Sequence, residues 1–430
     1  MRLSVYHNKL LIGFLDALPG GLSFCYAPEF LAEAPYPISL SLPLQEEPFA
    51  ARPTERFFDG LLPEEDERAR MARYLHVSST SLSKLLAALA GDCVGNLTLV
   101  APDDDIEQLL ARSGYRQLTV DGFQTVIGES PDFITKLSAE NRLSIPGAQS
   151  KIGLYRDSDE PPIDYAGWYI PQGLSASTHI VKPDSYSYPL TSLNEYLCVC
   201  LAKAAGIETA HVTLIKNQIA GKAVLVSRRF DRTREADGFV TRLWQEDLCQ
   251  ALSYSSRRKY ELDGGPGFSK ILDVLRSEAS SPPLEIRRFT QLFIFNYLIG
   301  NCDAHAKNYS LQRDTTGGLC LAPAYDLVTT TFYQSLSRNL ALGVAGVYSL
   351  DKITCEQWKS LCESAHLSWP WLCALAAETG KGALDALDGV GSTFPVAGFD
   401  DELRTLSEHL RTEISNRMRV FTADYPSANA

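Results

Sequence analysis

The chain has 430 residues, of which 45% are hydrophobic and 21% are charged, and these proportions are ordinary for a soluble globular protein. Its length suggests two or three domains and is ample for a sizeable core. The 52 acidic residues outnumber the 40 Lys and Arg residues, so the formal net charge is −12 and the chain is not expected to hold nucleic acid phosphates by itself, although a local basic face or a basic partner stays open.

Residues 1–110 are expected to form a first subdomain that mixes strands and helices. Short apolar runs predict strands at 10–15 and 39–44. Pro63, with the two glutamates after it, is typical of a helix start, and helix formers continue to residue 89. Residues 101–116 are acidic and polar, which suggests a boundary near residue 110.

The remainder of the chain changes character near residue 236. Residues 111–235 carry short strand-like runs and one helical pattern, and residues 236–430 are mainly helical. We therefore predict an α+β fold with two unlike lobes and a cleft between them. The expected strands are 117–120, 151–155, 179–182 and 223–229, and the expected helices are 194–205, 244–252, 268–275, 285–299, 355–365, 369–377 and 402–421.

Targeting and redox signals are weak along the whole chain. No apolar run approaches the ~18–20 residues that span a bilayer, and the first residues break apolarity too often for a secretory signal. The ten cysteines form no CxxC pair, and the seven histidines form no HExxH motif. We therefore expect a cytoplasmic protein with reduced thiols, no membrane contact, no disulfide framework and no zinc site.

The most informative stretch follows the apolar helix expected at 285–299. Asp303, His305, Lys307 and Asn308 crowd into six residues after Gly300, a residue that commonly ends helices. Asp303 and Asn308 stand five apart, as do the Asp that accepts the hydroxyl proton and the Asn that holds Mg²⁺ in protein kinases.

A second carboxylate, Asp326, follows a later apolar run and could hold a metal ion against phosphates. Taken singly, Asp303, His305 and Asp326 could each be a capping or turn residue. The combination of the Asp–Asn spacing with a later isolated Asp favours phosphoryl transfer.

Phosphoryl transfer also needs donors and cations that hold the phosphates. The loop 144–151 lies between two strand-like runs, and its Gly147 and Ala148 would let backbone N–H groups approach a ligand. Alone, the loop could be an ordinary hairpin turn. The residues of the loop that we assign to nucleotide binding are Gly147, Ala148, Gln149, Ser150 and Lys151.

A lysine and an acidic residue in the β-rich part could complete this site. Lys182 ends the strand at 179–182, and Glu195 at the start of the next helix could pair with it, as in kinases. The alternative is a solvated lysine and a glutamate at a favourable helix start. Near the exit of the strand at 223–229, Arg228 and Phe230 could bond an adenine edge with Asp231 near the ribose, or the same stretch could be an edge with Arg/Asp pairs.

With these residues in view, the chain resembles the HipA family, the kinase toxins of bacterial type II toxin–antitoxin modules. The resemblance extends over nearly the whole chain through many ordered matches, each weak alone. The matching segments are 26–30, 39–45, 57–63, 92–95, 144–151, 178–182, 194–196, 229–232, 245–247, 263–267, 303–308, 325–326 and 337–342.

The resemblance implies a protein-kinase-like fold with an extra N-terminal subdomain, and the use of ATP and Mg²⁺. It implies that Asp303 is the catalytic base and that Asn308 and Asp326 are metal ligands. Lys182 and the 144–151 loop would hold phosphates, while His305 and Lys307 would support the loop or the transferred phosphoryl group. Ser144 matches the autophosphorylated serine of the family, whose added charge of about −1.5 to −2 would push the loop away from a nucleotide.

The resemblance also implies a biological role. We expect a serine/threonine-protein kinase toxin whose substrate is a protein, by analogy an aminoacyl-tRNA synthetase, with growth arrest and drug tolerance (persistence) as the outcome. The expected partner is a HipB-like helix-turn-helix antitoxin, through which the chain would contact operator DNA. The alternatives are a small-molecule kinase on the same fold, and a corepressor that acts mainly through the antitoxin.

Overall fold

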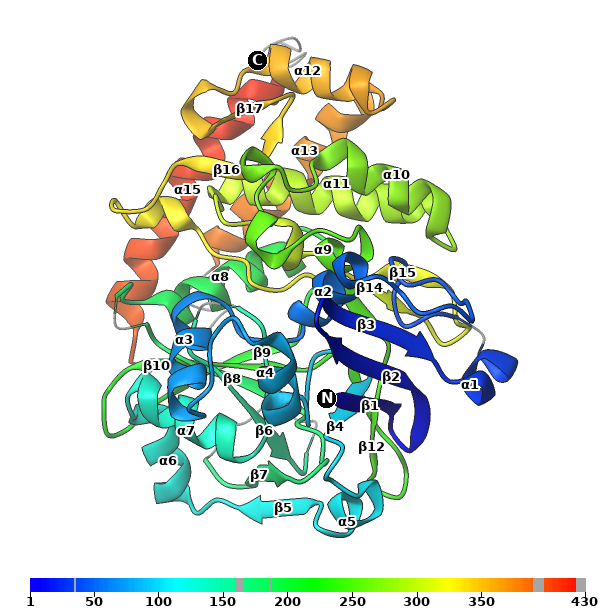
Figure 1. Cartoon of the computed structure of the whole chain (residues 1–430). Coiled ribbons are helices and arrows are strands. Elements are labelled where there is room, and N and C mark those ends of the chain that lie inside the picture. Colours follow the sequence, from blue (N-terminus) through cyan, green and yellow to red (C-terminus); the bar gives the residue numbers. More distant parts are fainter. Residues whose placement is uncertain (35, 148, 159–164, 186, 390–397, 423–430) are drawn as a thin grey trace. The chain divides into compact units, whose positions relative to one another are not determined.

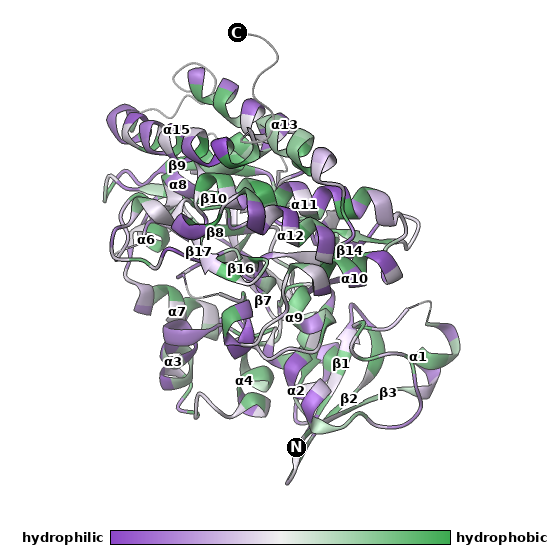
Figure 2. Ribbon diagram, turned by 90° about the horizontal axis from the view of Figure 1, so that it is seen from above, coloured by the Kyte–Doolittle hydropathy of each residue, from purple (hydrophilic) through white to green (hydrophobic). Residues whose placement is uncertain are grey.

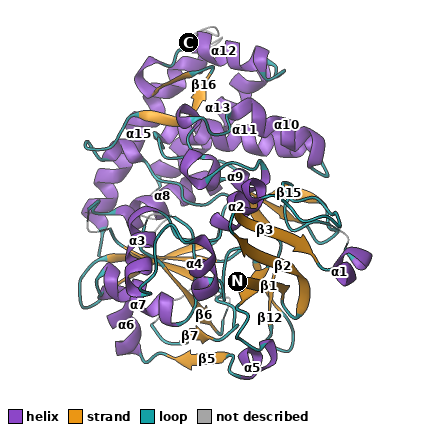
Figure 3. Cartoon of the chain, viewed as in Figure 1, coloured by secondary structure: helices purple, strands orange, loops and turns teal. Residues whose placement is uncertain are grey.

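The computed structural model describes residues 1–422 except 35, 148, 159–164, 186 and 390–397 (Figure 1). It separates into two compact units, each built from two stretches of the chain. Unit 1 comprises Met1–Ser185 and His211–Arg257, and unit 2 comprises Tyr186–Ala210 and Arg258–Ala430. The subdomain limits near 110 and 235 stay predictions. Figure 3 shows helices prevailing in the C-terminal part of the chain and most strands in the N-terminal part.

The N-terminal part of unit 1 is an antiparallel sheet with helices against it. Its order is β3-β2-β1-β4, and α2 packs against β3. The core includes Phe24, Phe58 and Leu86. The elements are β1 (Arg2–His7), β2 (Leu10–Leu18), β3 (Gly21–Tyr26), α1 (Pro28–Glu33), α2 (Ala51–Asp59), α3 (Glu65–Tyr74), α4 (Leu82–Leu89) and β4 (Leu97–Val100).

The rest of unit 1 is built on a six-stranded antiparallel sheet of order β5-β7-β6-β8-β10-β9. The side chain of Phe123 stacks on Trp168 in its core, with ring centroids 4.8 Å apart. The elements are α5 (Ile106–Ala111), β5 (Gly114–Gln117), α6 (Val120–Gly128), α7 (Pro131–Glu140), β6 (Ile152–Arg156), β7 (Trp168–Gln172), β8 (His179–Pro183), β9 (Val212–Lys216), β10 (Ala223–Arg228), β11 (Arg232–Arg234), β12 (Val240–Arg242), β13 (Gln245–Asp247) and α9 (Leu248–Ala251).

Unit 2 is a helical assembly around α11, against which α10, α13 and α15 pack. Rings of Tyr297, Trp358 and Phe421 meet at centroid distances of 5.0–6.0 Å in its core. In Figure 2, α15 carries hydrophilic and hydrophobic colours in alternation, as expected for a helix with one buried face. The α-helices are α8 (Thr191–Ala204), α10 (Phe268–Glu278), α11 (Pro282–Ile299), α12 (Cys355–Ser364), α13 (Trp369–Asp388) and α15 (Asp400–Thr422).

Short elements connect these helices. The strands β14 and β15 pair with each other, and so do β16 and β17. The chain passes from unit 1 to unit 2 within the 3₁₀ helix η1 (Ser256–Arg258). The short elements of unit 2 are η2 (Glu261–Asp263), η3 (Ala306–Asn308), β14 (Ser310–Arg313), β15 (Leu319–Leu321), η4 (Thr330–Phe332), β16 (Asn339–Val344), β17 (Val347–Ser349) and η5 (Leu350–Lys352).

Two secondary-structure predictions for the first subdomain are wrong. Residues 39–44 form a turn with one isolated bridge instead of a strand, because the Tyr26 hydroxyl bonds the carbonyl of Leu42 and the amide of Ile38. The helix predicted over 63–89 is broken between α3 and α4. His76 lies there in the left-handed region (φ 55°), and the following β-branched and hydroxyl residues are poor helix formers.

Two later elements also differ from expectation. The strand expected at 117–120 ends at Gln117, because Thr119 caps the start of α6 by accepting a hydrogen bond from the amide of Gly122. The helix expected at 244–252 is a short strand, β13, followed by α9, with Asp247 and Gln250 forming a reciprocal cap. Among the described residues, no helix combines the length and the apolar character needed to cross a bilayer.

Candidate functional site

The loop that carries Asp303 and Asn308 begins at a sharp helix end in unit 2. Gly300 closes α11 in the left-handed region at φ 71°. A Cβ there would lie 2.5 Å from the Thr331 hydroxyl oxygen, so glycine is required both by the backbone and by the space. The Thr330 hydroxyl accepts the amide of Cys302 and donates to the carbonyl of Gly300, which fixes the first turn of the loop.

Within the loop, hydrogen bonds bring the two predicted site residues onto one turn. The Asn308 side-chain amide donates to the Asp303 carbonyl at 2.9 Å. The Asp303 amide donates to the side chain of Asn301, which is itself bonded to Asn296 on α11. The side chain of Asp303 is exposed, and Asn308 is half-buried. The turn therefore carries an exposed carboxylate next to an amide that is bonded to the backbone of the same turn.

His305 and Lys307 are buried, each about 6% exposed. The His305 ring stands edge-on to Tyr260, with centroids 5.2 Å apart. The carbonyl of Lys307 accepts a hydrogen bond from the Tyr325 hydroxyl at 2.8 Å. Buried side chains can support the loop by packing beneath it. That role, and contact with a phosphoryl group, stay predictions for both residues.

Asp326 lies beside the same loop, because Tyr325 binds the carbonyl of Lys307, the residue before Asn308. Asp326 adopts φ 59°, a left-handed conformation that is uncommon for a residue other than glycine. Such strain persists only where neighbours hold it in place, and it is concentrated at functional sites. The sequence contains no signal for this conformation.

The chain after Asp326 is held by a buried asparagine on α8. Asn194, fully buried, accepts the amide of Thr329 at 2.9 Å and donates to the Thr329 carbonyl at 3.1 Å. Further along, the Thr331 hydroxyl donates to Glu413 of α15 at 2.5 Å. Sequence reasoning missed both anchors, since each joins residues more than 80 positions apart.

The predicted phosphate loop lies in unit 1 between α7 and β6. Gly147 has φ 111°, and a Cβ there would come within 2.5 Å of the Lys151 ammonium. Glycine thus lets Lys151 fold across the loop, where it donates to the Pro146 carbonyl at 2.7 Å. The Gln149 amide group contacts the Pro183 carbonyl at 3.4 Å, and Ala148 lies outside the described residues.

Two hydroxyls of this loop differ in environment. Ser144 is fully buried; its amide donates to the carbonyl of Asp92, and its hydroxyl donates to the carbonyl of Leu61 at 2.6 Å. The Ser150 hydroxyl oxygen is also buried, but it has no hydrogen-bond partner among the described residues. Buried polar atoms normally have a partner, and a ligand oxygen would reach the Ser150 hydroxyl only after the loop moves to expose it.

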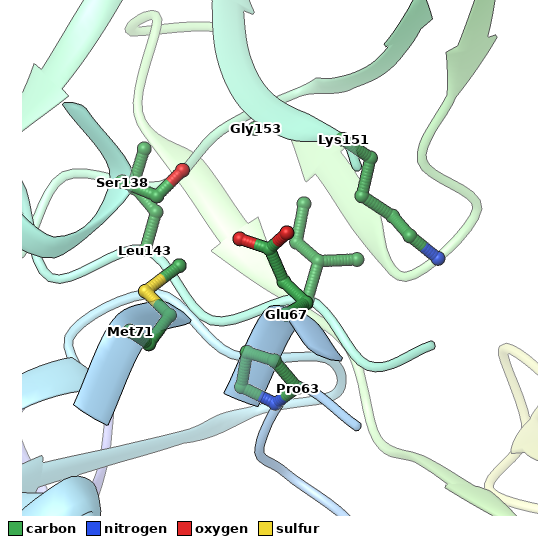
Figure 4. Close-up of a pocket in the computed structure, with 8 residues that line it drawn as sticks. Pro63, Glu67, Met71, Ser138, Leu143, Lys151 and Gly153 are labelled. Carbon is green, nitrogen blue, oxygen red and sulfur yellow. The ribbon is translucent and has the colours of Figure 1, made fainter. Parts of the chain in front are cut away.

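Figure 4 shows a small pocket behind this loop, with the Glu67 carboxylate directed toward its centre and the Lys151 ammonium directed away. Its free space is about 10 Å³, close to the minimum for one water molecule. It is therefore no nucleotide cavity. The lining residues are Pro63, Glu67, Met71, Ser138, Leu143, Ile145, Lys151 and Gly153.

The predicted Lys182–Glu195 pair divides between the two units. Lys182 lies on β8 of unit 1 and is about 6% exposed; Glu195 lies on α8 of unit 2 and is about 2% exposed. Lys182 is too buried to be the solvated lysine of the alternative interpretation, whereas Glu195 still lies near the start of α8. Their pairing stays a prediction.

The segment after β10 contains a buried ion network. Asp231 accepts two hydrogen bonds from Arg229, at 2.9 and 2.8 Å, and one from the Gly95 amide at 2.8 Å. Burial alone would raise the pKa of Asp231, but Arg229 and Arg232 hold it below its usual range. These contacts engage the Asp231 carboxylate. Its place near a ribose stays a prediction, as do the adenine contacts through Arg228 and Phe230.

The network also holds Asp92, which the sequence analysis used only as a marker of resemblance. Asp92 pairs with Arg232 at 2.9 Å and with Arg229 and Arg242 at 3.4 Å. Burial alone would raise the pKa of Asp92, but the three guanidinium groups together hold it well below its usual range. The network therefore anchors the start of the 144–151 loop, which bonds the backbone of Asp92.

Comparison with known proteins identifies the family. The HipA-like C-terminal domain matches residues 143–387, and the HipA N-terminal domain matches residues 3–100. The chain belongs to the HipA family. It is 34% identical to Y4mE of Sinorhizobium fredii, a protein with a provisional kinase name, over 86% of each chain. It is 26% identical to the serine/threonine-protein kinase toxin HipA of Shewanella oneidensis, over 85% of this chain and 84% of that one.

A solved structure confirms the fold class. The HipA chain of the Shewanella oneidensis MR-1 complex of HipA, HipB and operator DNA superposes with a TM-score of 0.83. The match covers 99% of this chain and 100% of that chain at 23% identity. The predicted α+β, kinase-like fold is therefore confirmed, and the kinase names of the HipA relatives support a HipA-type kinase.

The side chains of each unit have the chemistry that ATP with bound Mg²⁺ would need, and the two units are considered separately. In unit 2, the Asp326 carboxylate and the Asn308 amide supply oxygen donors of the kind that Mg²⁺ prefers. In unit 1, the open backbone of Gly147, the Lys151 ammonium and the Ser150 hydroxyl suit the oxygens of a phosphate. Among the described residues, no three or more His, Cys, Asp or Glu side chains are grouped so that they could hold a metal ion.

Proposed function

We propose that this chain is a HipA-type serine/threonine-protein kinase toxin that transfers the γ-phosphate of ATP to a protein hydroxyl. The observation that carries the proposal is the turn on which the Asn308 amide binds the Asp303 carbonyl at 2.9 Å. The bond keeps the proposed base and the proposed metal ligand on one turn, and the two residues stand five apart in the sequence, as the corresponding Asp and Asn do in protein kinases. The kinase toxin HipA of Shewanella oneidensis, similar over most of its length, supports the assignment.

The roles of the residues follow from their chemistry. Asp303 orients the substrate hydroxyl and accepts its proton. Asn308 and Asp326 would hold Mg²⁺, which neutralises charge on the phosphates when it is bound. Lys182, Lys151 and the backbone near Gly147 would hold ATP phosphates. Glu195 would orient Lys182, and the buried His305 and Lys307 keep the loop in shape.

We further propose that phosphorylation of Ser144 inactivates the enzyme. Its hydroxyl is buried and donates to the Leu61 carbonyl, so the loop must leave this position before the hydroxyl can be modified. A phosphoserine carries about −1.5 to −2 charges and lacks the proton that this bond needs. It could not return to its place beside a carbonyl oxygen, and the loop would remain out of the nucleotide site.

The partners are proposed by analogy with the relative. The solved Shewanella oneidensis complex contains HipA, HipB and operator DNA, and the net charge of −12 favours DNA contact through a basic partner. We therefore propose a HipB-like antitoxin as the partner that reaches DNA. The proposed protein substrate is an aminoacyl-tRNA synthetase.

The proposal is tested by phosphate transfer from labelled ATP with purified protein and a cell lysate. Asp303→Ala and Asp326→Ala should abolish transfer to protein while thermal unfolding stays unchanged. Asp273→Ala is the matched control: Asp273 lies on α10 of the same unit and pairs only at the surface with Arg276. Full transfer by Asp326→Ala would refute the metal site, and transfer to small metabolites alone would refute a protein substrate.

The identity of the substrate is tested in cells. Phosphorylated peptides are compared between cells that express the intact protein and cells that express Asp303→Ala. A phosphoserine or phosphothreonine present only with the intact protein identifies the target. A synthetase among the targets supports the proposed substrate, and a target set without one refutes it.

A further inference from the structure

A tyrosine that no motif singled out contacts the proposed catalytic base. The Tyr260 hydroxyl donates a hydrogen bond to Oδ1 of Asp303 at 2.5 Å. The two residues are 43 positions apart in the sequence, so no local sequence pattern predicts the contact. A hydrogen bond in which a carboxylate is the acceptor is shorter and stronger than a hydrogen bond between two neutral groups.

The position of Tyr260 is set by a tight turn rich in glycine. The Tyr260 carbonyl accepts the amides of Asp263 at 3.1 Å and Gly265 at 2.9 Å. Gly264 adopts φ 84°, and a Cβ on Gly265 would lie only 2.4 Å from the Arg258 carbonyl. The glycines of segment 263–267, one of the segments that resemble the HipA family, thus form the turn that holds Tyr260 in place.

Three further contacts tie this turn to the rest of unit 2. The Ala306 amide in the Asp303 loop donates to the carbonyl of Lys259 at 3.2 Å. The Tyr260 ring stands edge-on to His305. The Glu261 carboxylate accepts the Gly343 amide of β16 at 2.7 Å. The residues on both sides of Tyr260 are therefore bonded to other parts of unit 2, and its ring packs against His305, which limits how far its hydroxyl can move with the Asp303 carboxylate.

We propose that Tyr260 is a positioning residue that fixes the orientation of the Asp303 carboxylate for phosphoryl transfer. This inference rests on the proposed function. By binding Oδ1, the phenol holds the plane of the carboxylate so that the substrate hydroxyl meets Oδ2 in one orientation. The substrate proton passes to Oδ2 as the new oxygen–phosphorus bond forms and the bond to ADP breaks. Tyr260 keeps its own proton throughout.

A positioning role predicts a specific kinetic pattern. Loss of the phenol would leave the carboxylate present but free to rotate, so the fraction of time in the reactive orientation falls. The loss should appear in kcat, because the substrate hydroxyl is aligned only in the complex, while the KM for ATP should not change. A tenfold or larger loss of kcat is expected for a hydrogen bond to a charged group.

The test uses Tyr260→Phe, which removes one oxygen and keeps the ring against His305. Tyr74→Phe is the matched control, because the Tyr74 hydroxyl also donates to a carboxylate, Glu140, at 2.9 Å and at an exposed site of unit 1. Tyr260→Phe should lose at least tenfold in kcat with an unchanged KM for ATP, and Tyr74→Phe should match the wild type. Unchanged or increased kcat in Tyr260→Phe would overturn the inference.

A crystallographic comparison separates this inference from the proposed function. Structures of the wild type and Tyr260→Phe should show the Asp303 carboxylate in one orientation in the first and rotated or spread over several in the second. An identical carboxylate in both would overturn the positioning role whatever the activity. Absence of phosphate transfer in the wild type would instead refute the proposed function, and the two structures would still decide whether Tyr260 holds Asp303.

Discussion

Replacing Asp92 by alanine should destabilise unit 1 more than any exposed Asp replacement. Its carboxylate is 2% exposed and pairs with Arg232 at 2.9 Å and with Arg229 and Arg242 at 3.4 Å. It also accepts the amide of Ser177 at 2.9 Å and its hydroxyl at 2.5 Å. Asp92→Ala would leave three guanidinium groups buried with one carboxylate, Asp231, among them.

The magnitude follows from this geometry. Two unit charges 2.9 Å apart attract by about 6 kcal/mol at an effective dielectric constant of 20, and the cost of burying both ions offsets part of this. Removal of one partner of a buried pair costs about 3–5 kcal/mol, because the remaining charge stays buried. We expect a loss of that size in the free energy of unfolding.

The assay combines denaturant unfolding with hydrogen exchange. The Ser177 and Ser144 amides donate to the side chain and to the carbonyl of Asp92, so they report on the network directly. Asp92→Asn keeps the volume and removes the charge, and should also lose stability. Asp16→Ala is the control, since Asp16 pairs with Arg2 at the surface, and its unfolding midpoint should hardly move.

Two results would refute this reasoning. Asp92→Asn as stable as the wild type would show that the charge is not needed, and Asp92→Ala that behaves like Asp16→Ala would show that the network contributes little. The pH dependence gives a third check. Because the folded protein lowers the pKa of Asp92, its contribution is complete above about pH 4, the unfolded value, and is lost as the pH falls below it.

Three more predictions concern the support of the Asp303 loop. Gly300→Ala should cost about 1–3 kcal/mol of stability, measured by denaturant unfolding, because the new Cβ meets the Thr331 hydroxyl in a left-handed conformation. Asn194→Ala should speed hydrogen exchange at the amide of Thr329, which loses its acceptor; unchanged exchange would contradict this. The His409 ring lies 3.1 Å from the Thr331 hydroxyl, and burial lowers its pKa. The unfolding free energy should therefore fall as the pH drops below about 6.5, and His409→Gln should flatten that part of the pH profile.

Local signals predicted the regular elements where one pattern ran without interruption. The strands β2, β6, β8 and β10 and the helices α8, α11 and α15 are confirmed close to their expected limits, since apolar runs and periodic spacing act over a few residues. The turn that carries Asp303 and Asn308 was likewise predictable, because its residues are adjacent in the chain.

Features that depend on distant residues left no such signal. The pair of Asp92 and Arg229 joins residues 137 positions apart, and Tyr260 reaches Asp303 over 43. The left-handed backbone of Asp326 is uncommon for a residue other than glycine, and no local pattern in the sequence indicates it. Asp231 was predicted near a ribose from its place at the exit of the strand at 223–229, and that position stays a prediction. The contact of its carboxylate with the Gly95 amide of the first subdomain has no local signal.

The division of the chain into units has a consequence for biosynthesis. The six-stranded sheet of unit 1 takes β8 from before residue 186, and it takes the next two strands in the sheet, β10 and β9, from after residue 210, with α8 of unit 2 made in between. On the ribosome, α8 therefore emerges long before α11 and α13, the helices of its own unit. A nascent chain that stalls between residues 210 and 223 would expose a six-stranded sheet without β10 and an α8 without the other helices of its unit, a state prone to aggregation and to degradation. Neither unit can be expressed by cutting the gene at a single point.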